Sequence, residues 1–515
     1  MKKKIIIISI VILLSGVCFY SFIFGNKSTS TVEVSKDKSS KDESGIDWSK
    51  YETYDVNLDS GNVNINKAGV YNINGILNDG SITVNTIDNV KLVLNGVTIN
   101  SNNPGINVSN SKNCYIEIKG DNKITSNTND ALDAAIYSKS DLFLYGDGSI
   151  EINSNKDGIA SKDDLTILSG KYVINSDKDG IKGRDSLCIK DGTFTIKSAD
   201  GIKTTNEKKG ELIIENGTFN ISSSQDGIDS ISSLTISSGK FEITTGGSTD
   251  KSTKGIKAEG EIIINNGTFT IDSIDDAIHS NKNVIINNGT FEISSSDDGM
   301  HADNSLTIKD GKIKIYKSHE GLEAYTINVD GGDVNITADD DGINVAGGKD
   351  SSGSEFNDNG GKLNINGGKI YINSSGDGLD SNGSIYMNFG EVYVDGPVDN
   401  GNGALDYNGE FKITGGTLIA VGSSSMAQNV SNISTQTSIL VNLDSTVSGD
   451  ISIGSISFSP AKKYQSILVS SSDFKSGESY TLKYGSSSQE VSLTSTVTTV
   501  GNSSGMMGGR GFGRR

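Results

Sequence analysis

Two neighbouring acidic phrases hold the side chains best suited to chemistry in this sequence. Residues 275–279 read DDAIH, and residues 297–301, 22 positions later, read DDGMH with Asp303 close behind. Carboxylates and imidazoles at this spacing can hold a metal ion or transfer a proton. Related phrases recur in both directions along the chain, so the chemistry belongs to a repeat and not to a single site.

Each repeat contains two short strands and a polar corner. An apolar-x-apolar strand leads through an Asn-Gly or Asp-Gly turn into a strand of the Gly-Thr-Phe-x-Ile type, and Asp-Gly-Ile or a close variant forms the corner. Alternation at period two is typical of half-buried strands, and glycine permits the left-handed backbone of the turns. We call the carboxylate that opens each corner the corner acid. The corner acids are Asp157, Asp179, Asp200, Asp226, Asp276, Asp298, Glu320, Asp341 and Asp377.

The length of the repeat indicates the architecture. Most corner acids follow one another after 21 or 22 residues, which is too short for a four-stranded propeller blade and fits one coil of a parallel β-helix. Equivalent side chains then stack about 4.8 Å apart on neighbouring strands. We therefore predict an all-β parallel β-helix in which Phe and Ile columns form an internal ladder and the corner acids form an external one.

The N-terminus predicts export. Three lysines precede an almost unbroken apolar run from Ile5 to Phe24, which is long enough to cross a bilayer as a helix. We expect an extracellular, cell-surface protein that is either anchored in the membrane by this segment or secreted. The predicted parts are a signal or membrane-anchor segment (1–25), a flexible linker (26–46), the parallel β-helix (47–422), a β-rich C-terminal cap (423–500) and a disordered Gly/Met/Arg tail (501–515).

Composition and charge narrow the range of partners. The chain has 62 Gly, 3 Pro and a formal net charge of −19, and such an acidic protein repels nucleic acid and favours divalent cations. Outside the N-terminal segment the cysteines are Cys114 and Cys188, so no disulfide framework supports the fold. We expect a monomer that binds no nucleic acid and is stabilised by stacking or by ions.

Stacking brings the corner acids close to one another. Two unit charges about 4.8 Å apart repel by about 3.5 kcal/mol at an effective dielectric of 20, and bound cations relieve that repulsion. Calcium accepts about six to eight hard oxygen ligands in flexible geometry, so we predict calcium as the cofactor; the alternative is that each Asp-Gly forms a solvated turn. The predicted calcium ligands are Asp130, Asp133, Asp226, Asp229, Asp276, Asp298, Glu320, Glu323, Asp341, Asp377 and Asp380.

The residue three places after each corner acid varies in charge, and we call these residues the third-position series. A turn that serves structure alone does not need such a graded set. The three histidines, His279, His301 and His319, fall close together; they could form a transition-metal or proton-transfer site, and we favour hydrogen bonding on a sugar-binding surface. The series contains Ala160, Lys182, Lys203, Asp229, His279, His301, Glu323, Asn344 and Asp380.

A polysaccharide surface needs exposed aromatic and charged side chains. Tyr371 and Tyr393 take the outward position of the second strand on coils 22 residues apart, so they should lie side by side, on one face with Lys314 and Asn335. Tyrosine is also a good strand former, which leaves a purely structural role open. Lysines of the third-position series could contact uronate carboxylates. The predicted carbohydrate-binding residues are Lys182, Lys203, His279, His301, Tyr371 and Tyr393.

Several long phrases resemble one protein family. KAGVYNINGILNDGSITV, VKLVLNGVTI, DALDAAIYSKSDLFLYGDGSI and KDGIASKDDLTILSGKYVINSDKDGIKGRDSL are similar to the body of bacterial carbohydrate-binding β-helix proteins, which are related in fold to pectate lyases. The resemblance runs from about Asp47 to about Gly501. It implies a right-handed, pectate-lyase-like β-helix with calcium in its acidic turns, which binds cellulose or acidic sugars such as polygalacturonate without established cleavage. It does not identify the individual sugar ligands, because the motif repeats.

A polysaccharide lyase acting on uronans is one alternative function. Such an enzyme needs calcium and a strong base, for which the chain offers Arg184, the one Arg before the tail, or Lys182. The carboxylates beside that base would be Asp157, Asp179 and Asp200.

Two further alternatives do not use that base. A hydrolase needs two carboxyl groups about 5 Å apart for retention, or about 6.5 to 9.5 Å apart for inversion, which Asp276 and Asp298 could satisfy, as could almost every neighbouring pair of corner acids. A surface adhesin or spacer needs only its length. We favour a non-enzymatic, calcium-bound, cell-surface carbohydrate-binding protein.

Overall fold

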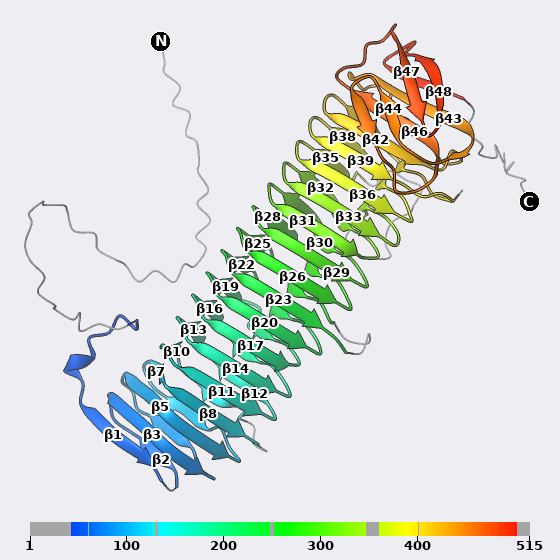
Figure 1. Cartoon of the computed structure of the whole chain (residues 1–515). Coiled ribbons are helices and arrows are strands. Elements are labelled where there is room, and N and C mark those ends of the chain that lie inside the picture. Colours follow the sequence, from blue (N-terminus) through cyan, green and yellow to red (C-terminus); the bar gives the residue numbers. More distant parts are fainter. Residues whose placement is uncertain are drawn as a thin grey trace, which may run out of the picture. The chain divides into compact units, whose positions relative to one another are not determined.

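The computed structural model describes residues 43–59, 61–128, 132–247, 252–346, 360–399 and 401–501. They belong to one compact unit from Lys41 onward, which forms a parallel β-solenoid of about 15 turns (Figure 1) and confirms the predicted parallel β-helix. The predicted membrane segment, most of the predicted linker and all but Gly501 of the predicted tail lie outside the described residues. Within the described ranges, no helix has the length and apolar character needed to cross a bilayer.

Parallel strands in three faces build the solenoid, and the 3-10 helix η1 (Trp48–Lys50) leads into the first of them. The first face contains β1 (Thr53–Leu58), β3 (Gly69–Asn78), β5 (Val90–Ser101), β7 (Cys114–Lys119), β10 (Leu142–Tyr145), β13 (Asp164–Ile167), β16 (Ser186–Ile189), β19 (Glu211–Ile214), β22 (Leu234–Ile236), β25 (Ile262–Ile264), β28 (Asn283–Ile286), β30 (Met300–Ile308), β32 (Leu322–Val329), β35 (Lys362–Ile365), β38 (Ser384–Met387) and β41 (Phe411–Ile413). The long strands β3 and β5 continue into the second face, and β30 and β32 begin in the third.

The second face carries the Gly-Thr-Phe-x-Ile strands. It contains β8 (Asp121–Ser126), β11 (Ser149–Ser154), β14 (Lys171–Ser176), β17 (Thr193–Ser198), β20 (Thr218–Ser223), β23 (Lys240–Thr245), β26 (Thr268–Ser273), β29 (Thr290–Ser295), β31 (Lys312–Lys317), β33 (Asp333–Ala338), β36 (Lys369–Ser374), β39 (Glu391–Asp395) and β42 (Thr417–Gly422).

The third face consists mostly of short strands that follow the acidic corners. It contains β2 (Val63–Ile65), β4 (Ile82–Asn85), β6 (Ile106–Asn110), β9 (Ala134–Ser138), β12 (Asp157–Ser161), β15 (Ile181–Gly183), β18 (Ile202–Thr204), β21 (Ile228–Ser230), β24 (Ile256–Ala258), β27 (Ile278–Ser280), β34 (Ile343–Val345), β37 (Leu379–Ser381) and β40 (Leu405–Tyr407).

The second face gives the core its most regular stack. Phe219, Phe241 and Phe269 point inward on successive turns, with ring centroids 4.7 Å apart and ring planes within 2° of parallel. The turn before each Phe needs glycine, because φ is +138° at Gly217 and no side chain adopts that backbone easily. The predicted internal ladder is therefore confirmed.

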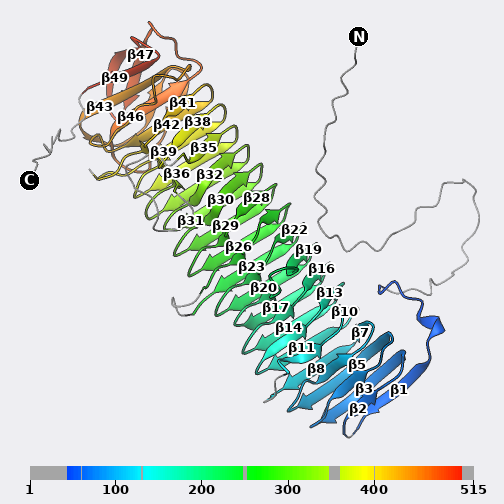
Figure 2. The same cartoon turned by 180° about the vertical axis from the view of Figure 1, so that it is seen from behind.

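The repeat ends with β42, and the C-terminal strands follow a different plan. β46 (Tyr464–Ser471) pairs antiparallel with β42 and with β43 (Ser438–Val447), and β49 (Val497–Val500) pairs with β43. β44 (Ile451–Ile453), β45 (Ile456–Phe458), β47 (Ser479–Tyr484) and β48 (Ser487–Ser492) form a separate four-stranded sheet. These strands, which we call the C-terminal section, cover the edge of the last solenoid turn (Figure 2), as parallel sheets with open edges require.

Candidate functional site

The acidic corners bring ionisable side chains of neighbouring turns together. A glycine follows most corner acids because the next turn comes very close: a Cβ on Gly180 would lie 2.6 Å from the carbonyl oxygen of Gly201. The corner acids also join the turns. The backbone N–H of Asp226 donates to Asp200 Oδ1 at 2.9 Å, and that of Asp298 donates to Asp276 Oδ1 at 3.0 Å.

These hydrogen bonds place most corner acids inside the protein. Asp157 is 0% exposed and Asp200 3%, so these corner acids do not form the external ladder that the sequence predicted. Burial of an ionised carboxylate is costly unless the carboxylate is paired with a cation or well hydrogen-bonded. The partner of each carboxylate therefore decides what each corner can do.

The third-position series lies in one continuous column, which the register of the third face confirms. Two members were missed by the sequence analysis, Lys257 between Asp229 and His279, and Asp406 after Asp380. Lys254 was also missed; it stands where a corner acid is expected. The phrase Lys254-Gly255-Ile256 is the corner motif with its sign reversed, so a search for Gly-Ile alone would have found it.

Lysines neutralise the corners of the early turns. Lys182 Nζ lies 2.8 Å from Asp157 Oδ2 and also pairs with Asp179. Lys203 Nζ lies 2.6 Å from Asp200 and 2.9 Å from Asp229. Burial alone would lower the pKa of each lysine, but the two carboxylates beside it raise the pKa instead.

This geometry bears on two roles expected for these lysines. Each ammonium group already contacts two carboxylates, so neither is a free ligand for a uronate. A lysine whose pKa is raised is also a poor general base, which disfavours Lys182 as the base of a lyase. Arg184, the other candidate base, is exposed and lies two residues beyond Lys182.

The next corner contains two lysines, which contact the acids on either side of it. Lys254 Nζ lies 2.6 Å from Asp275 and 2.7 Å from Asp276, while Lys257 lies 3.8 Å from Asp226. Asp226 Oδ1 accepts hydrogen bonds from the Ser252 hydroxyl at 2.7 Å and the Lys254 N–H at 2.9 Å. The predicted calcium ligands Asp226 and Asp229 are thus already satisfied by groups of the chain.

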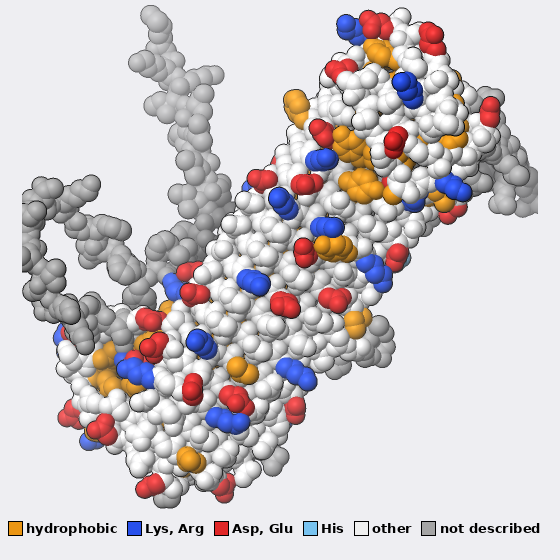
Figure 3. All heavy atoms as spheres, viewed as in Figure 1, with side chains coloured by type: hydrophobic (Ala, Val, Ile, Leu, Met, Phe, Trp, Pro, Cys, Tyr) orange, Lys and Arg blue, Asp and Glu red, His pale blue; other side chains and the backbone are white. Residues whose placement is uncertain are grey.

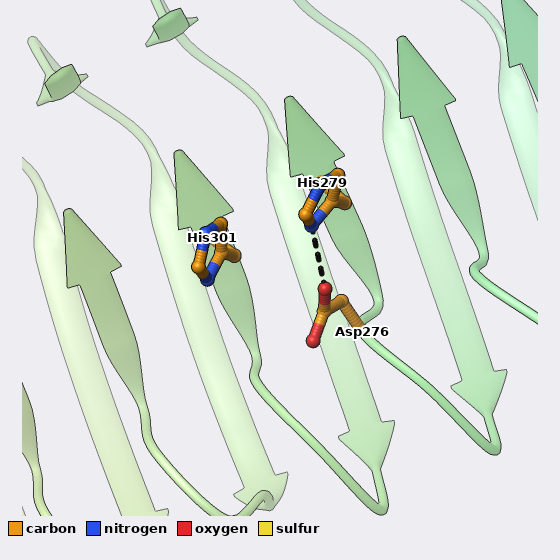
Figure 4. A group of neighbouring side chains, drawn as sticks. All are labelled: Asp276, His279 and His301. Carbon is orange, nitrogen blue, oxygen red and sulfur yellow. Dashed lines mark hydrogen bonds and ion pairs between the residues drawn. The ribbon is translucent and has the colours of Figure 1, made fainter. Parts of the chain in front are cut away.

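His279 and His301 stack on neighbouring turns, with ring centroids 4.7 Å apart (Figure 4). His279 Nδ1 lies 2.7 Å from Asp276 Oδ2. His301 Nδ1 lies 3.1 Å from Asp298 Oδ2 and 2.8 Å from Glu323 Oε2. Burial alone would lower the pKa of His301, but its two carboxylate partners raise it to about 11.

A protonated His301 therefore takes the place that lysine takes in the earlier corners. Because it is 3% exposed, it is not displayed on the surface where a sugar would contact it. His319 does not join the pair: its side chain is exposed and lies 3.9 Å from Asp340. The three histidines do not converge on one point.

The pair of carboxylates considered for hydrolysis has divergent acidities. Burial raises the pKa of Asp298 to about 8, helped by the charge of Asp276 and contact with Glu323. Burial acts in the same direction on Asp276, but hydrogen bonding to His279 and the charge of Lys254 lower its pKa. One raised and one lowered pKa suit a general acid and a general base. Both side chains, however, are about 95% shielded from solvent. A sugar does not reach them in this conformation.

The later corners have no such cations. In the described part of the chain, no Lys, Arg or His lies within ion-pair distance of Glu320, Asp341, Asp377 or Asp380. Burial raises the pKa of Glu320 to about 10, assisted by the charges of Glu323 and Asp298. Burial and neighbouring carboxylates likewise raise the pKa of Asp341 to about 8, Asp377 to about 6 and Asp380 to about 7.

Two buried oxygens in the same region lack partners. Glu320 Oε2 and Asn344 Oδ1 accept no hydrogen bond from the described residues, and Asn344 follows Glu323 in the third-position series. We call Glu320, Asp341, Asn344, Asp377 and Asp380 the uncompensated corners. Their donor set consists of oxygen atoms, which are the ligands that calcium prefers.

Two remaining predicted calcium ligands lie at an earlier corner. Asp130 is outside the described residues. Asp133 lies 4.0 Å from Lys162, with its side chain 35% exposed. Among the described residues, this corner therefore contributes one predicted calcium ligand.

The two predicted sugar-binding tyrosines lie on the second face. Register pairs Lys314 with Asn335, Asn335 with Tyr371, and Tyr371 with Tyr393, as expected from the repeat. Both rings are half-buried against Phe458 of the C-terminal section, with centroid distances of 6.4 Å and 5.6 Å. The sequence did not foresee Phe458 because it lies outside the repeat.

Two known proteins are similar to part of this chain. A protein of Acetivibrio thermocellus described as carbohydrate-binding domain-containing is 33% identical over 131 residues, which is 21% of this chain and 43% of that protein. The chain thus matches less than half the length of that relative. A solved structure described as a polysaccharide lyase-like protein from C. thermocellum, in a gadolinium derivative, is 29% identical with a TM-score of 0.38, covering 41% of this chain and 96% of the other.

A family profile covers most of the solenoid. The profile of carbohydrate-binding domain-containing proteins matches residues 59–299 and 298–401, a region that includes all corners described above and ends before the C-terminal section. This match spans well over half of the chain, which belongs to the family of carbohydrate-binding domain-containing proteins.

Proposed function

We propose that this chain is an exported, cell-surface protein that binds polysaccharide, such as cellulose or polygalacturonate, on a solenoid loaded with calcium, and that it does not cleave its ligand. Membership of the family of carbohydrate-binding domain-containing proteins supports a carbohydrate as the ligand. The role of calcium rests on one observation, which is that early and late corners differ in whether a cationic side chain lies beside their carboxylates. Lysine or histidine contacts the corner acids from Asp157 to Asp298, whereas the uncompensated corners contain partly buried carboxylates that no Lys, Arg or His of the described residues contacts.

Calcium fits the uncompensated corners chemically. Asp341, Asp377 and Asp380 offer carboxylates on neighbouring turns, and the free oxygens of Glu320 and Asn344 add further donors. A divalent cation would offset both the burial and the carboxylate repulsion that raise the pKa of these carboxyl groups. The oxygen-only donor set and the absence of histidine among these five residues favour calcium over a transition metal.

Calcium also suggests how an acidic polymer could bind an acidic protein. An ion held on one side by protein carboxylates keeps coordination positions for the carboxylate and hydroxyl groups of a uronate. Binding of polygalacturonate should then depend directly on calcium. Binding of cellulose, which has no carboxylate, should depend on calcium only through the stability of the solenoid.

A pull-down experiment tests this function. The full-length chain in mild detergent would be incubated with cellulose and with polygalacturonate, in calcium and in chelator, while unsaturated uronate and new reducing ends are assayed in the same tubes. We expect calcium-promoted retention on polygalacturonate without product. Product release would make the protein an enzyme, and retention on neither polymer would favour an adhesin or spacer.

A further inference from the structure

A hollow of about 470 Å³ lies where the second face of the solenoid meets the C-terminal section. Its floor includes Asn335, Lys369, Tyr371 and Tyr393, and its wall is formed by the strand β45 and the residues next to it. Hydrophobic side chains gather on this side of the molecule near β36 and β39, beneath the C-terminal section (Figure 3). The hollow is separate from the acidic corners, which lead into the third face.

The floor of the hollow repeats with the solenoid. Asn335, Tyr371 and Tyr393 occupy the same outward position on three successive turns, so neighbouring side chains lie about 4.8 Å apart along the axis. That step is close to the length of one unit in a 1,4-linked sugar chain. Successive sugar units can therefore face successive turns.

The aromatic rings are held in place before any ligand arrives. The Tyr371 hydroxyl donates to Asp395 Oδ2 at 3.0 Å, and the Tyr393 hydroxyl donates to Glu391 Oε2 at 3.1 Å. Asp395 also accepts the backbone N–H of Ala461 at 2.6 Å, which ties the C-terminal section to the same carboxylate. Fixed side chains lose little freedom on binding, so such a site needs less interaction energy for a given affinity.

The chemistry of the hollow combines apolar rings with polar groups. The Lys369 ammonium lies 5.6 Å from the centre of the Tyr393 ring, and no ion pair of Lys369 occurs within the described residues. Ser457 stands exposed beside the buried Phe458. A pyranose has a C–H face that can pack on an aromatic ring, and hydroxyl groups around its edge. The hollow complements both, because its aromatic rings are bordered by amide, ammonium and hydroxyl groups.

We propose that this hollow binds a pyranose unit of a polysaccharide chain that runs along the solenoid axis. The proposal deepens the polysaccharide-binding function above and rests on it. Phe458 and Ser457 lie beyond residue 401, where the family profile ends, so family membership does not assign this site. The C-terminal section thereby acquires a role in ligand binding as well as in covering the last turn.

The test compares three variants of the full-length chain in calcium. Tyr393→Ala removes an aromatic ring from the floor, and Ser457→Trp fills the hollow while both tyrosines stay in place. The matched control is Tyr386→Ala, because Tyr386 is a half-buried tyrosine of β38 on the other face of the same turn. Calorimetry with a cello-hexaose and with a hexagalacturonate distinguishes a neutral from an acidic pyranose, and thermal melting checks the fold of each variant.

We expect at least tenfold weaker binding for Tyr393→Ala and Ser457→Trp, and binding within twofold of the unaltered chain for Tyr386→Ala. Unchanged affinity of Ser457→Trp would overturn the proposal even if Tyr393→Ala binds weakly, because the hollow would then be filled without effect. In that case the proposed polysaccharide binding would stand. If the unaltered chain bound neither polysaccharides nor oligosaccharides, the proposed function would fail and this inference with it.

Discussion

Chelation of calcium should destabilise the protein in a manner that depends on pH. The carboxyls of Asp341, Asp377 and Asp380 have pKa values of about 8, 6 and 7 in the folded chain, and a pKa near 3.9 is usual for an unfolded Asp. The folded state therefore holds more protons than the unfolded state between about pH 4 and pH 8. Without calcium, stability should fall as pH rises through this window.

The magnitude follows from the shifts. One unit of pKa corresponds to about 1.4 kcal/mol, so ionisation of Asp380 alone costs the folded chain about 4 kcal/mol. Asp377 raises the pKa of Asp380, and both raise the pKa of Asp341, so their effects do not add, and the cluster as a whole should cost on the order of 5–10 kcal/mol. For a chain of this size, that corresponds to a fall in Tm of about 5–10 °C.

Thermal melting in calcium and in chelator, at pH 5 and at pH 8, measures this effect. We expect a large difference between calcium and chelator at pH 8 and a much smaller one at pH 5. In chelator at pH 8, Asp380→Asn should raise Tm, because the amide removes a buried charge. Asp200→Asn is the matched control and should lower Tm with or without calcium, because Asp200 is already paired with Lys203. A calcium effect equal at both pH values, or a loss of stability in Asp380→Asn, would refute this reasoning.

Three further predictions concern the interior. Lys203→Met should destabilise the chain by about 3–5 kcal/mol in denaturant unfolding, because it leaves the carboxylates of Asp200 and Asp229 buried without their cation; no loss would mean that the pair is solvated. Phe241→Ala should cost about 3–5 kcal/mol, because it opens a cavity in the aromatic stack, whereas Phe241→Leu should cost less; equal effects would argue against close packing. In NMR spectra, the His301 imidazole should stay protonated from pH 5 to pH 9, since its pKa is raised to about 11, and a titration near pH 6.5 would show that Asp298 and Glu323 do not hold the proton there.

The fold could be predicted because the same alternation of apolar and polar residues recurs in each repeat. The spacing of Phe219, Phe241 and Phe269 fixes which side chains point inward, and strand alternation then fixes the register. The continuity of the third-position series followed from the same register. These features depend on local periodicity, which a single sequence displays directly.

The electrostatic state of the corners could not be predicted in the same way. Burial of Asp200 depends on a backbone N–H from the next turn, which leaves no signature in residue types. Lys254 escaped notice because it interrupts the series of corner acids, although it neutralises two of them. The contact of Phe458 with Tyr371 and Tyr393 joins segments far apart in sequence, and the C-terminal section has no period from which to infer it.

We propose that calcium occupies the uncompensated corners and not the corners neutralised by lysine. Anomalous scattering from a crystal grown in calcium tests this most directly. We expect calcium peaks bound by Asp341, Asp377 and Asp380, and none between Asp157 and Asp229. Peaks at the lysine-bearing corners, or none at the uncompensated corners in saturating calcium, would contradict it.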